Sequence, residues 1–286
     1  MARFALHRLE QPLEMAVALR PIAVLLLVLL AAAVPAGAAE AQLDVPFERY
    51  TLPNGLEVVL HRDTTAPLIA VDIWYHVGSG DEMPGKSGFA HLFEHMMFQG
   101  TANTGEDRHF PVLQEAGASE VNGFTNNNRT DYYEVLPSNQ LETALWLESE
   151  RMAHLPEAIT EKSLANQRDV VRNERRQNFE NVPYGRDRFA VAAALYPEGH
   201  PYRHLGIGLH EDVEGGSLAD VKGFFRTWYV PANATLVIAG DFDPAAARAL
   251  VEKWFGSFPK STKPAHRVVE TPTISGVRRV EVHDSF

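Results

Sequence analysis

The chain has 286 residues, a formal net charge of −11 and no cysteine. Its hydrophobic fraction of 45% is sufficient for a globular core, and its acidic balance argues against a nucleic-acid-binding surface. Because cysteine is absent, disulfides, thiolate metal sites and cysteine nucleophiles are excluded, and any bound metal ion must be held by His, Asp or Glu.

The N-terminal region has the pattern of an export signal. An apolar run at residues 21–35 follows Arg20 and is followed by small residues at 36–42, the order found in secretory signal peptides. We therefore predict a signal peptide at residues 1–41, export to the periplasm or the medium, and no membrane attachment after cleavage. The alternative is an uncleaved anchor, since residues 21–39 approach the length that spans a bilayer.

From residue 42 onward, hydrophobic periodicity predicts strands and helices in alternation. Thr160 and Ser217 are expected N-caps, and Gly256 is an expected helix stop. The pattern predicts an α+β fold, with a mixed, mostly antiparallel sheet and helices packed on one face. Expected strands cover residues 56–61, 68–77, 129–136 and 234–239, and expected helices cover residues 86–98, 139–154, 160–178, 185–195, 217–228 and 244–255.

The C-terminal residues differ in composition from the rest. Residues 259–272 are rich in Pro, Lys and Thr and are typical of a linker, whereas residues 277–283 alternate in the manner of a strand. We therefore predict a main domain at residues 42–258, followed at 259–286 by a linker and the start of a truncated second domain.

The segment from His91 to His95 has the form H-x-x-E-H on an expected helix. Two histidines at positions i and i+4 share one helical face, so both imidazoles can reach one Zn²⁺ ion. Glu94 lies beside them, where its carboxylate can accept a proton from an activated water and return it to a leaving amine. The motif therefore predicts a hydrolytic zinc site with Glu94 as the base.

A catalytic zinc site needs a third protein ligand and one open position. Glu174 is the best placed acid, because it shares a helical face with Gln167, Val170 and Val171, which we expect to pack inward. Glu161 and Glu180 are weaker candidates on or near the same helix. A carboxylate on a buried face needs a partner, and zinc would provide it.

The sequence around this motif resembles the pitrilysin/insulinase peptidases, the inverzincins with an inverted zinc motif. That family includes the mitochondrial processing peptidases and many bacterial zinc proteases. The similarity covers roughly residues 47–259. The matching segments are Gly88 to Thr101, Asn122-Gly123-Phe124-Thr125, Arg168 to Glu174, His200-Pro201-Tyr202, and residues 229–242.

The resemblance implies a metallopeptidase half-domain that cuts peptides or unfolded segments. It implies zinc ligands His91, His95 and Glu174, with Glu94 as the base. A strand at Asn122, Gly123, Phe124 and Thr125 would accept extended substrate by strand addition. Family members often have an acidic residue where Gln167 stands, so Gln167 is expected only to orient Glu174 by hydrogen bonding.

Family members usually pair such a domain with a similar domain that lacks zinc, and we expect a homologous domain or subunit to complete the substrate chamber. Two alternatives stay open: a non-catalytic structural or assembly subunit of the same fold, and an inactive truncated fragment. Residues 206–208 are expected to form a loop and not a nucleotide site. Arg172, Arg175 and Arg176 are expected to form a solvated helix face.

Overall fold

The computed structural model describes residues 44–284. The predicted signal peptide at residues 1–41 therefore lies outside the described residues. No helix in the described part of the chain is both long enough and apolar enough to cross a bilayer.

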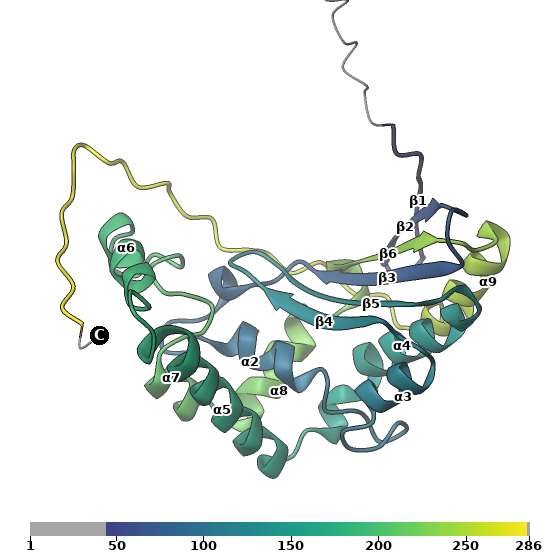
Figure 1. The fold of residues 1–286 in the computed structure, drawn as a ribbon, viewed down its shortest axis with the longest axis horizontal. Coiled ribbons are helices and arrows are strands. Elements are labelled where there is room, and N and C mark those ends of the chain that lie inside the picture. The colour runs from purple at the N-terminus through teal and green to yellow at the C-terminus, as the bar shows by residue number, and fades with distance from the viewer. Residues whose placement is uncertain (1–43, 285–286) are drawn as a thin grey trace, which may run out of the picture. The chain divides into compact units, whose positions relative to one another are not determined.

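Within residues 44–284, one six-stranded sheet has the strand order β1-β2-β6-β3-β5-β4. The pairing of β2 with β6 is parallel, and the other neighbouring strands run antiparallel. The helices pack under one face of this sheet (Figure 1), which confirms the predicted α+β class. The strands are β1 (Glu48–Thr51), β2 (Glu57–Arg62), β3 (Leu68–Tyr75), β4 (Glu120–Thr125), β5 (Thr130–Pro137) and β6 (Ala234–Gly240).

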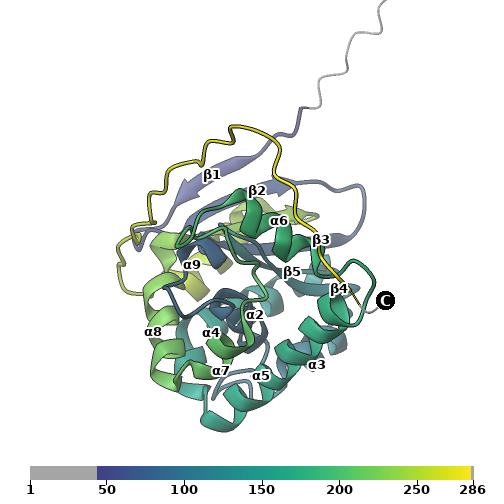
Figure 2. The ribbon, with the colours of Figure 1, turned by 90° about the vertical axis from the view of Figure 1, so that its left-hand side faces the viewer.

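The helices that matter most for the site are α2, α5 and α8. Helix α2 packs against both α5 and α8 and also against strand β4. Figure 2 shows the same layer from the side, with α2, α4, α5, α7 and α8 beneath the strands. The helices are α2 (Phe89–Met96), α3 (His109–Glu115), α4 (Leu141–Ala158), α5 (Glu161–Arg175), α6 (Asp187–Leu195), α7 (His210–Gly215), α8 (Leu218–Trp228) and α9 (Pro244–Phe255).

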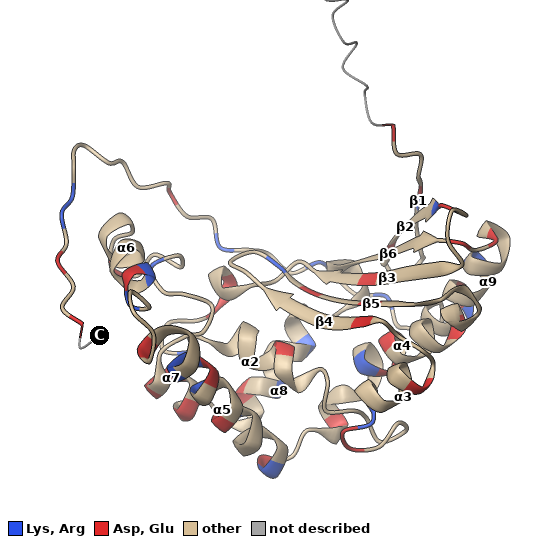
Figure 3. Cartoon of the chain, in the orientation of Figure 1, with Lys and Arg blue, Asp and Glu red and all other residues tan. Residues whose placement is uncertain are grey.

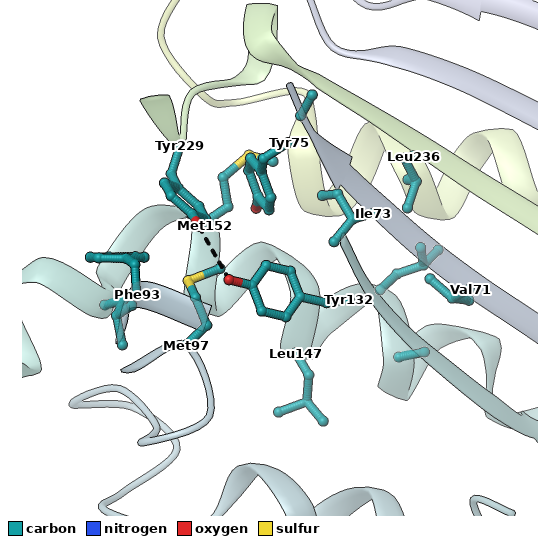
Figure 4. Packing of buried hydrophobic residues seen from close by; sticks show 14 of the residues in the cluster. Val71, Ile73, Tyr75, Phe93, Met97, Tyr132, Leu147, Met152, Tyr229 and Leu236 are labelled. Atoms are coloured by element: carbon teal, nitrogen blue, oxygen red, sulfur yellow. Dashed lines mark hydrogen bonds between the residues drawn. The ribbon is translucent and has the colours of Figure 1, made fainter. Parts of the chain in front are cut away.

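Strand alternation creates the core between the sheet and the helices. In β3, Ile69, Val71, Ile73 and Tyr75 are buried while the residues between them are more exposed, as expected when only one face of a sheet is covered. Figure 4 shows Val71, Ile73 and Tyr75 on the same side of the sheet as residues from α2, α4 and the end of α8. In the same view the hydroxyl groups of Tyr132 and Tyr229 form a hydrogen bond of 3.2 Å.

Most of the expected elements form close to their predicted bounds. Thr160 and Ser217 cap α5 and α8 through side-chain hydrogen bonds, as their sequence positions predict. Helix α2 begins at Phe89, later than expected, because Gly88 has a φ of 90°, which lies outside the helical region. The expected strand at residues 277–283 does not form, and no described strand lies beside it to supply hydrogen bonds.

Candidate metal and catalytic site

Helix α2 presents both histidines of the motif on one side. Its apolar positions, Phe89, Leu92, Phe93 and Met96, are buried against the core, and this fixes the rotation of the helix so that the histidines face α5. The Nε2 atoms of His91 and His95 are 3.4 Å apart. The i, i+4 spacing therefore brings the two imidazoles together, as the sequence predicts.

Glu174 from α5 completes the group. Its Oε2 atom is 3.5 Å from Nε2 of His91 and 3.2 Å from Nε2 of His95. Among the described residues, these three form the group whose ligand atoms lie close enough to hold one metal ion. Glu161 and Glu180, the weaker candidates, are not part of this group.

The spacing of these atoms can be compared with the geometry of zinc. Bonds of about 2.0–2.1 Å in a tetrahedral site place neighbouring ligand atoms roughly 3.3–3.4 Å apart. The three separations of 3.2, 3.4 and 3.5 Å are close to that edge length. Two imidazoles and one carboxylate, with a fourth position open, are also a donor set that catalytic zinc uses. The residues present therefore fit a zinc ion.

The pKa shifts of His91 and Glu174 also suit metal binding. Burial, with a smaller contribution from His95, lowers the pKa of His91 to about 4, against the opposing effect of Glu174. The hydrogen bond with His95 lowers the pKa of Glu174 and outweighs its partial burial. A neutral imidazole and an ionised carboxylate are the forms that coordinate a metal ion. The Nδ1 atom of His91 is buried and has no hydrogen-bond partner among residues 44–284.

Glu94 lies between the histidine pair and strand β4. A Cβ atom added to Gly123 would lie 3.0 Å from Cγ of Glu94, so the strand backbone and the glutamate are in close contact. Burial raises the pKa of Glu94, while Thr125 and His95 act in the opposite direction. One carboxylate oxygen, Oε2, is buried without a hydrogen-bond partner in the described chain and is free to accept a proton.

Strand β4 carries the four residues that were expected to bind substrate. It lies at the edge of the sheet and pairs only with β5, so one side of its backbone has no strand neighbour within residues 44–284. Asn122 bonds its own neighbour, Gly123 N, and the Phe124 side chain is half exposed. Thr125 lies next to Glu94 at the end of this strand. An extended peptide can pair with such an edge.

Two sequence expectations about α5 are only partly correct. Gln167 and Val171 are buried as expected, whereas Val170 is 40% exposed. The structure gives no hydrogen bond between Gln167 and Glu174. Arg175, which was assigned to a solvated face, is mostly buried and bonds Glu180 and the carbonyl of Gly208. Its neighbour Arg176 is exposed as predicted.

The sequence did not reveal how the start of α2 is held. The carboxylate of Glu82 is buried and accepts hydrogen bonds from the backbone N–H groups of Gly88, at 3.0 Å, and Ala90, at 2.7 Å. It replaces the side-chain cap that Gly88 lacks. An acidic residue six positions before the N-cap is not a recognised capping pattern, so no local signal identifies it.

Comparisons with known proteins agree with this geometry. Residues 57–197 match the family described as Insulinase (Peptidase family M16), and residues 217–285 match the Peptidase M16 inactive domain. The chain is 32% identical over 241 residues to Zinc protease PqqE of Helicobacter pylori, covering 82% of this chain and 53% of that protein. It is 27% identical to the mitochondrial-processing peptidase subunit beta of Lentinula edodes, covering 77% of this chain and 46% of the relative.

Solved structures show the same fold. A protease from Helicobacter pylori superposes with a TM-score of 0.73 at 32% identity, covering 79% of this chain and 54% of that chain. The periplasmic protease PqqL from Escherichia coli superposes with a TM-score of 0.73 at 25% identity, covering 80% of this chain and 26% of that one. The chain thus spans about half the length of the two sequence relatives and about a quarter of the length of PqqL. It belongs to the insulinase family of peptidases, family M16.

Proposed function

We propose that this chain is the metal-bearing half of a zinc metalloendopeptidase that hydrolyses peptide bonds in peptides or unfolded segments. The observation that carries the proposal is the placing of three ligand atoms at near-tetrahedral spacing beside Glu94 and an unpaired strand edge. Relatives named zinc proteases, including PqqE, support the same activity.

In this proposal His91, His95 and Glu174 hold the zinc ion. A zinc ion in such a site acts as a Lewis acid that activates water and polarises a carbonyl group. Glu94 accepts a proton from the attacking water at its free Oε2 atom and later donates it to the leaving amine. Its raised pKa brings proton affinity closer to neutral pH, which suits a group that must both take and release a proton.

The backbone of β4 binds the substrate in an extended conformation. Gly123 allows this strand to approach Glu94 closely, so a peptide paired with the strand lies beside the base. Backbone pairing depends little on side-chain identity and therefore suits substrates of varied sequence. The half-exposed ring of Phe124 supplies an apolar contact for one substrate side chain.

A second domain or subunit of the same fold, without zinc, completes the substrate chamber in this proposal. Two observations support it: the chain spans about half of the full length of these relatives, and residues 217–285 match an inactive M16 domain. The domain division at residues 42–258 and 259–286 belongs to the same proposal. Export after removal of residues 1–41 is proposed from the N-terminal pattern and from the similarity to a periplasmic protease.

A non-catalytic subunit is the second candidate, and the match to an inactive domain is the observation that favours it. Against it stands the complete set of His91, Glu94, His95 and Glu174, which a purely structural subunit has no need to keep together.

The test measures zinc content and peptide hydrolysis separately. The full chain, supplied with its companion domain, is assayed with a quenched fluorescent unstructured peptide, and bound zinc is determined by metal analysis. Glu94→Gln is expected to retain one zinc per chain and to lower kcat/KM by about 10²–10⁴-fold, the usual contribution of a general base. Glu161→Gln, an exposed acid on α5, is the control and should leave both unchanged. Wild-type protein without bound zinc, or full hydrolysis by Glu94→Gln, would contradict the proposal.

A further inference from the structure

Helices α2 and α5 must be held at a fixed spacing for their side chains to share one ion, and residues 207–216 contact both of them. This stretch, called the bridging segment here, contains α7 and lies beside α5 (Figure 1). Both acidic and basic positions occur where α5 and α7 lie beside one another (Figure 3).

The bridging segment is bonded to the residue that precedes the N-cap of α2. Asp212 accepts hydrogen bonds from the Ser87 backbone N–H at 3.1 Å and from the Ser87 hydroxyl at 2.6 Å. The same hydroxyl accepts a hydrogen bond from Leu209 N at 2.9 Å. Ser87 is 4% exposed, so these bonds form where water cannot replace them easily. Ser87 lies four positions before His91.

The backbones also approach each other closely at this point. A Cβ atom added to Gly208 would lie 2.4 Å from Cα of Gly88 and 2.5 Å from its nitrogen, and the φ of Gly208 is +71°. Val213 packs against Gly88 from the same side, because its Cγ2 atom would be 2.7 Å from a Cβ there. The segment therefore rests directly on the start of α2.

On its other side the bridging segment forms hydrogen bonds and an ion pair with arginines of α5. Arg168 donates to the carbonyl of Gly216, Arg175 donates to the carbonyl of Gly208, and Arg172 pairs with Glu214 at 3.1 Å. These arginines are spaced four and three positions apart, so they lie along one face of the helix. Arg175 is adjacent in sequence to Glu174 and is 14% exposed.

From these contacts we propose that the bridging segment is a positioning element that sets the spacing of α2 and α5, with Asp212 and Arg175 as its positioning residues. Gly208 joins the two sets of contacts: its backbone rests on Gly88, and its carbonyl receives Arg175. The bridging segment thus links the helix of the histidine pair to the helix of Glu174 through hydrogen bonds and backbone contacts that do not involve the metal site. This inference rests on the proposed zinc site.

The test compares zinc affinity in variants of the full chain, using Zn²⁺ in competition with a chromophoric chelator. Asp212→Ala and Arg175→Ala are each expected to weaken zinc affinity by about tenfold, the lower end of the effect of groups that orient ligands. The matched controls are Glu211→Ala for Asp212 and Arg176→Ala for Arg175. Each control removes an exposed neighbouring side chain of the same charge, so zinc affinity should stay within about twofold of wild type. Asp212→Asn, which keeps an acceptor for Ser87, is expected to restore part of the affinity.

Two further measurements separate positioning from a general loss of stability. Visible absorption of bound Co²⁺ reports ligand geometry and should change in Asp212→Ala but not in Glu211→Ala. If Asp212→Ala does not give folded metal-free protein, Ser87→Ala removes only the connecting hydroxyl and is measured in its place. If folded Asp212→Ala and Arg175→Ala bind zinc as tightly as wild type and show an unchanged Co²⁺ spectrum, the positioning role is wrong while the proposed function is unaffected. A wild-type chain that binds no zinc would instead overturn the proposed function.

Discussion

The candidate metal site and a buried ionic cluster of Glu134, Glu148 and Arg151 both place carboxylates beneath the sheet, but they differ in their access to solvent. His91 and Glu174 are 14% and 32% exposed at their side chains. All three members of the buried ionic cluster are 2% exposed or less. The first group can therefore exchange a ligand or a metal ion with solvent, whereas the second must balance its charge within the protein.

The aromatic side chains of Tyr132 and Phe98 lie near both groups. The guanidinium of Arg151 lies 4.3 Å from the ring centre of Tyr132, on the side of the buried ionic cluster. A Cβ atom on Gly123 would meet both Tyr132 and Glu94, on the side of the metal site. The same layer of the protein therefore contains one partly exposed candidate metal site and one fully buried ionic cluster.

The largest expected change in stability comes from breaking the buried ionic cluster. Arg151→Met removes the only cation of the buried ionic cluster and leaves Glu148 without the guanidinium that bonds it at 2.8 Å. Breaking a buried pair from one side typically costs about 3–5 kcal/mol, so the free energy of unfolding should fall by that amount in urea titrations. Arg248→Met, which removes an exposed pair with Glu48, should cost less than about 1 kcal/mol. If Arg151→Met and Arg248→Met lower the free energy of unfolding equally, burial does not make the Arg151 ion pair more important than an exposed one.

The next effect is on the metal site. His95→Ala removes one of the three candidate protein ligands. Structural zinc sites with four protein ligands bind the ion with roughly 12 kcal/mol, which corresponds to about 3 kcal/mol for each ligand. Zinc affinity should therefore fall by about 100-fold or more, while the unfolding free energy of metal-free protein should change little. Isothermal titration with Zn²⁺ and urea unfolding in the presence of chelator measure the two quantities. The comparison fails if the metal-free protein is destabilised as strongly as by Arg151→Met.

A smaller effect concerns pH and Glu134. Burial, reinforced by the nearby Glu148 carboxylate, raises the pKa of Glu134 well above its usual value of 4.5. The folded state then retains a proton that the unfolded chain releases, so stability is present below about pH 4.5 and is lost as pH rises toward the folded pKa. Glu134→Gln cannot titrate and should gain at least about 1 kcal/mol relative to wild type between pH 5 and pH 8, the value of one pKa unit. Parallel stability curves for the two proteins would contradict this assignment.

The smallest effect is expected at Asp72, on the uncovered face of the sheet. Burial raises its pKa from 3.8 to about 6, although a hydrogen bond from Trp74 opposes the change. Stability should therefore fall between about pH 4 and pH 6 and level off above pH 7. Because solvent screens this partly exposed group, Asp72→Asn should recover only about 1 kcal/mol at pH 7. Thermal unfolding measured across this pH range should show that the stability difference between Asp72→Asn and wild type stops changing above about pH 7.

The sequence predicts the long periodic elements of this fold and the centre of its site. Helix α9 and strand β3 follow from apolar periodicity, and the i, i+4 spacing of His91 and His95 follows from the helix itself. The short elements β1, α3 and α7 were not predicted, because four to seven residues do not show a period. Strand β4 was expected only from family resemblance, since its exposed side chains carry little apolar signal.

The supporting contacts could not be predicted, for a different reason. Asp212 and Ser87 are 125 positions apart, and nothing in either segment identifies the other as a partner. Arg175 looks like a surface residue by composition, yet the loop after α6 folds back over it. Such contacts depend on tertiary packing, which local pattern does not encode.

One consequence follows from where the candidate ligands stand in the sequence. His95 and Glu174 are 79 positions apart (174 − 95), and β4, β5 and α4 lie between them. A metal ion bound to both would close this long loop of chain and act as a removable cross-link in a protein that has no cysteine. By the chain-entropy relation used for disulfides, a loop of that length corresponds to a stabilisation on the order of 4 kcal/mol. Resistance to unfolding and to other proteases would then depend on the zinc supply of the surroundings.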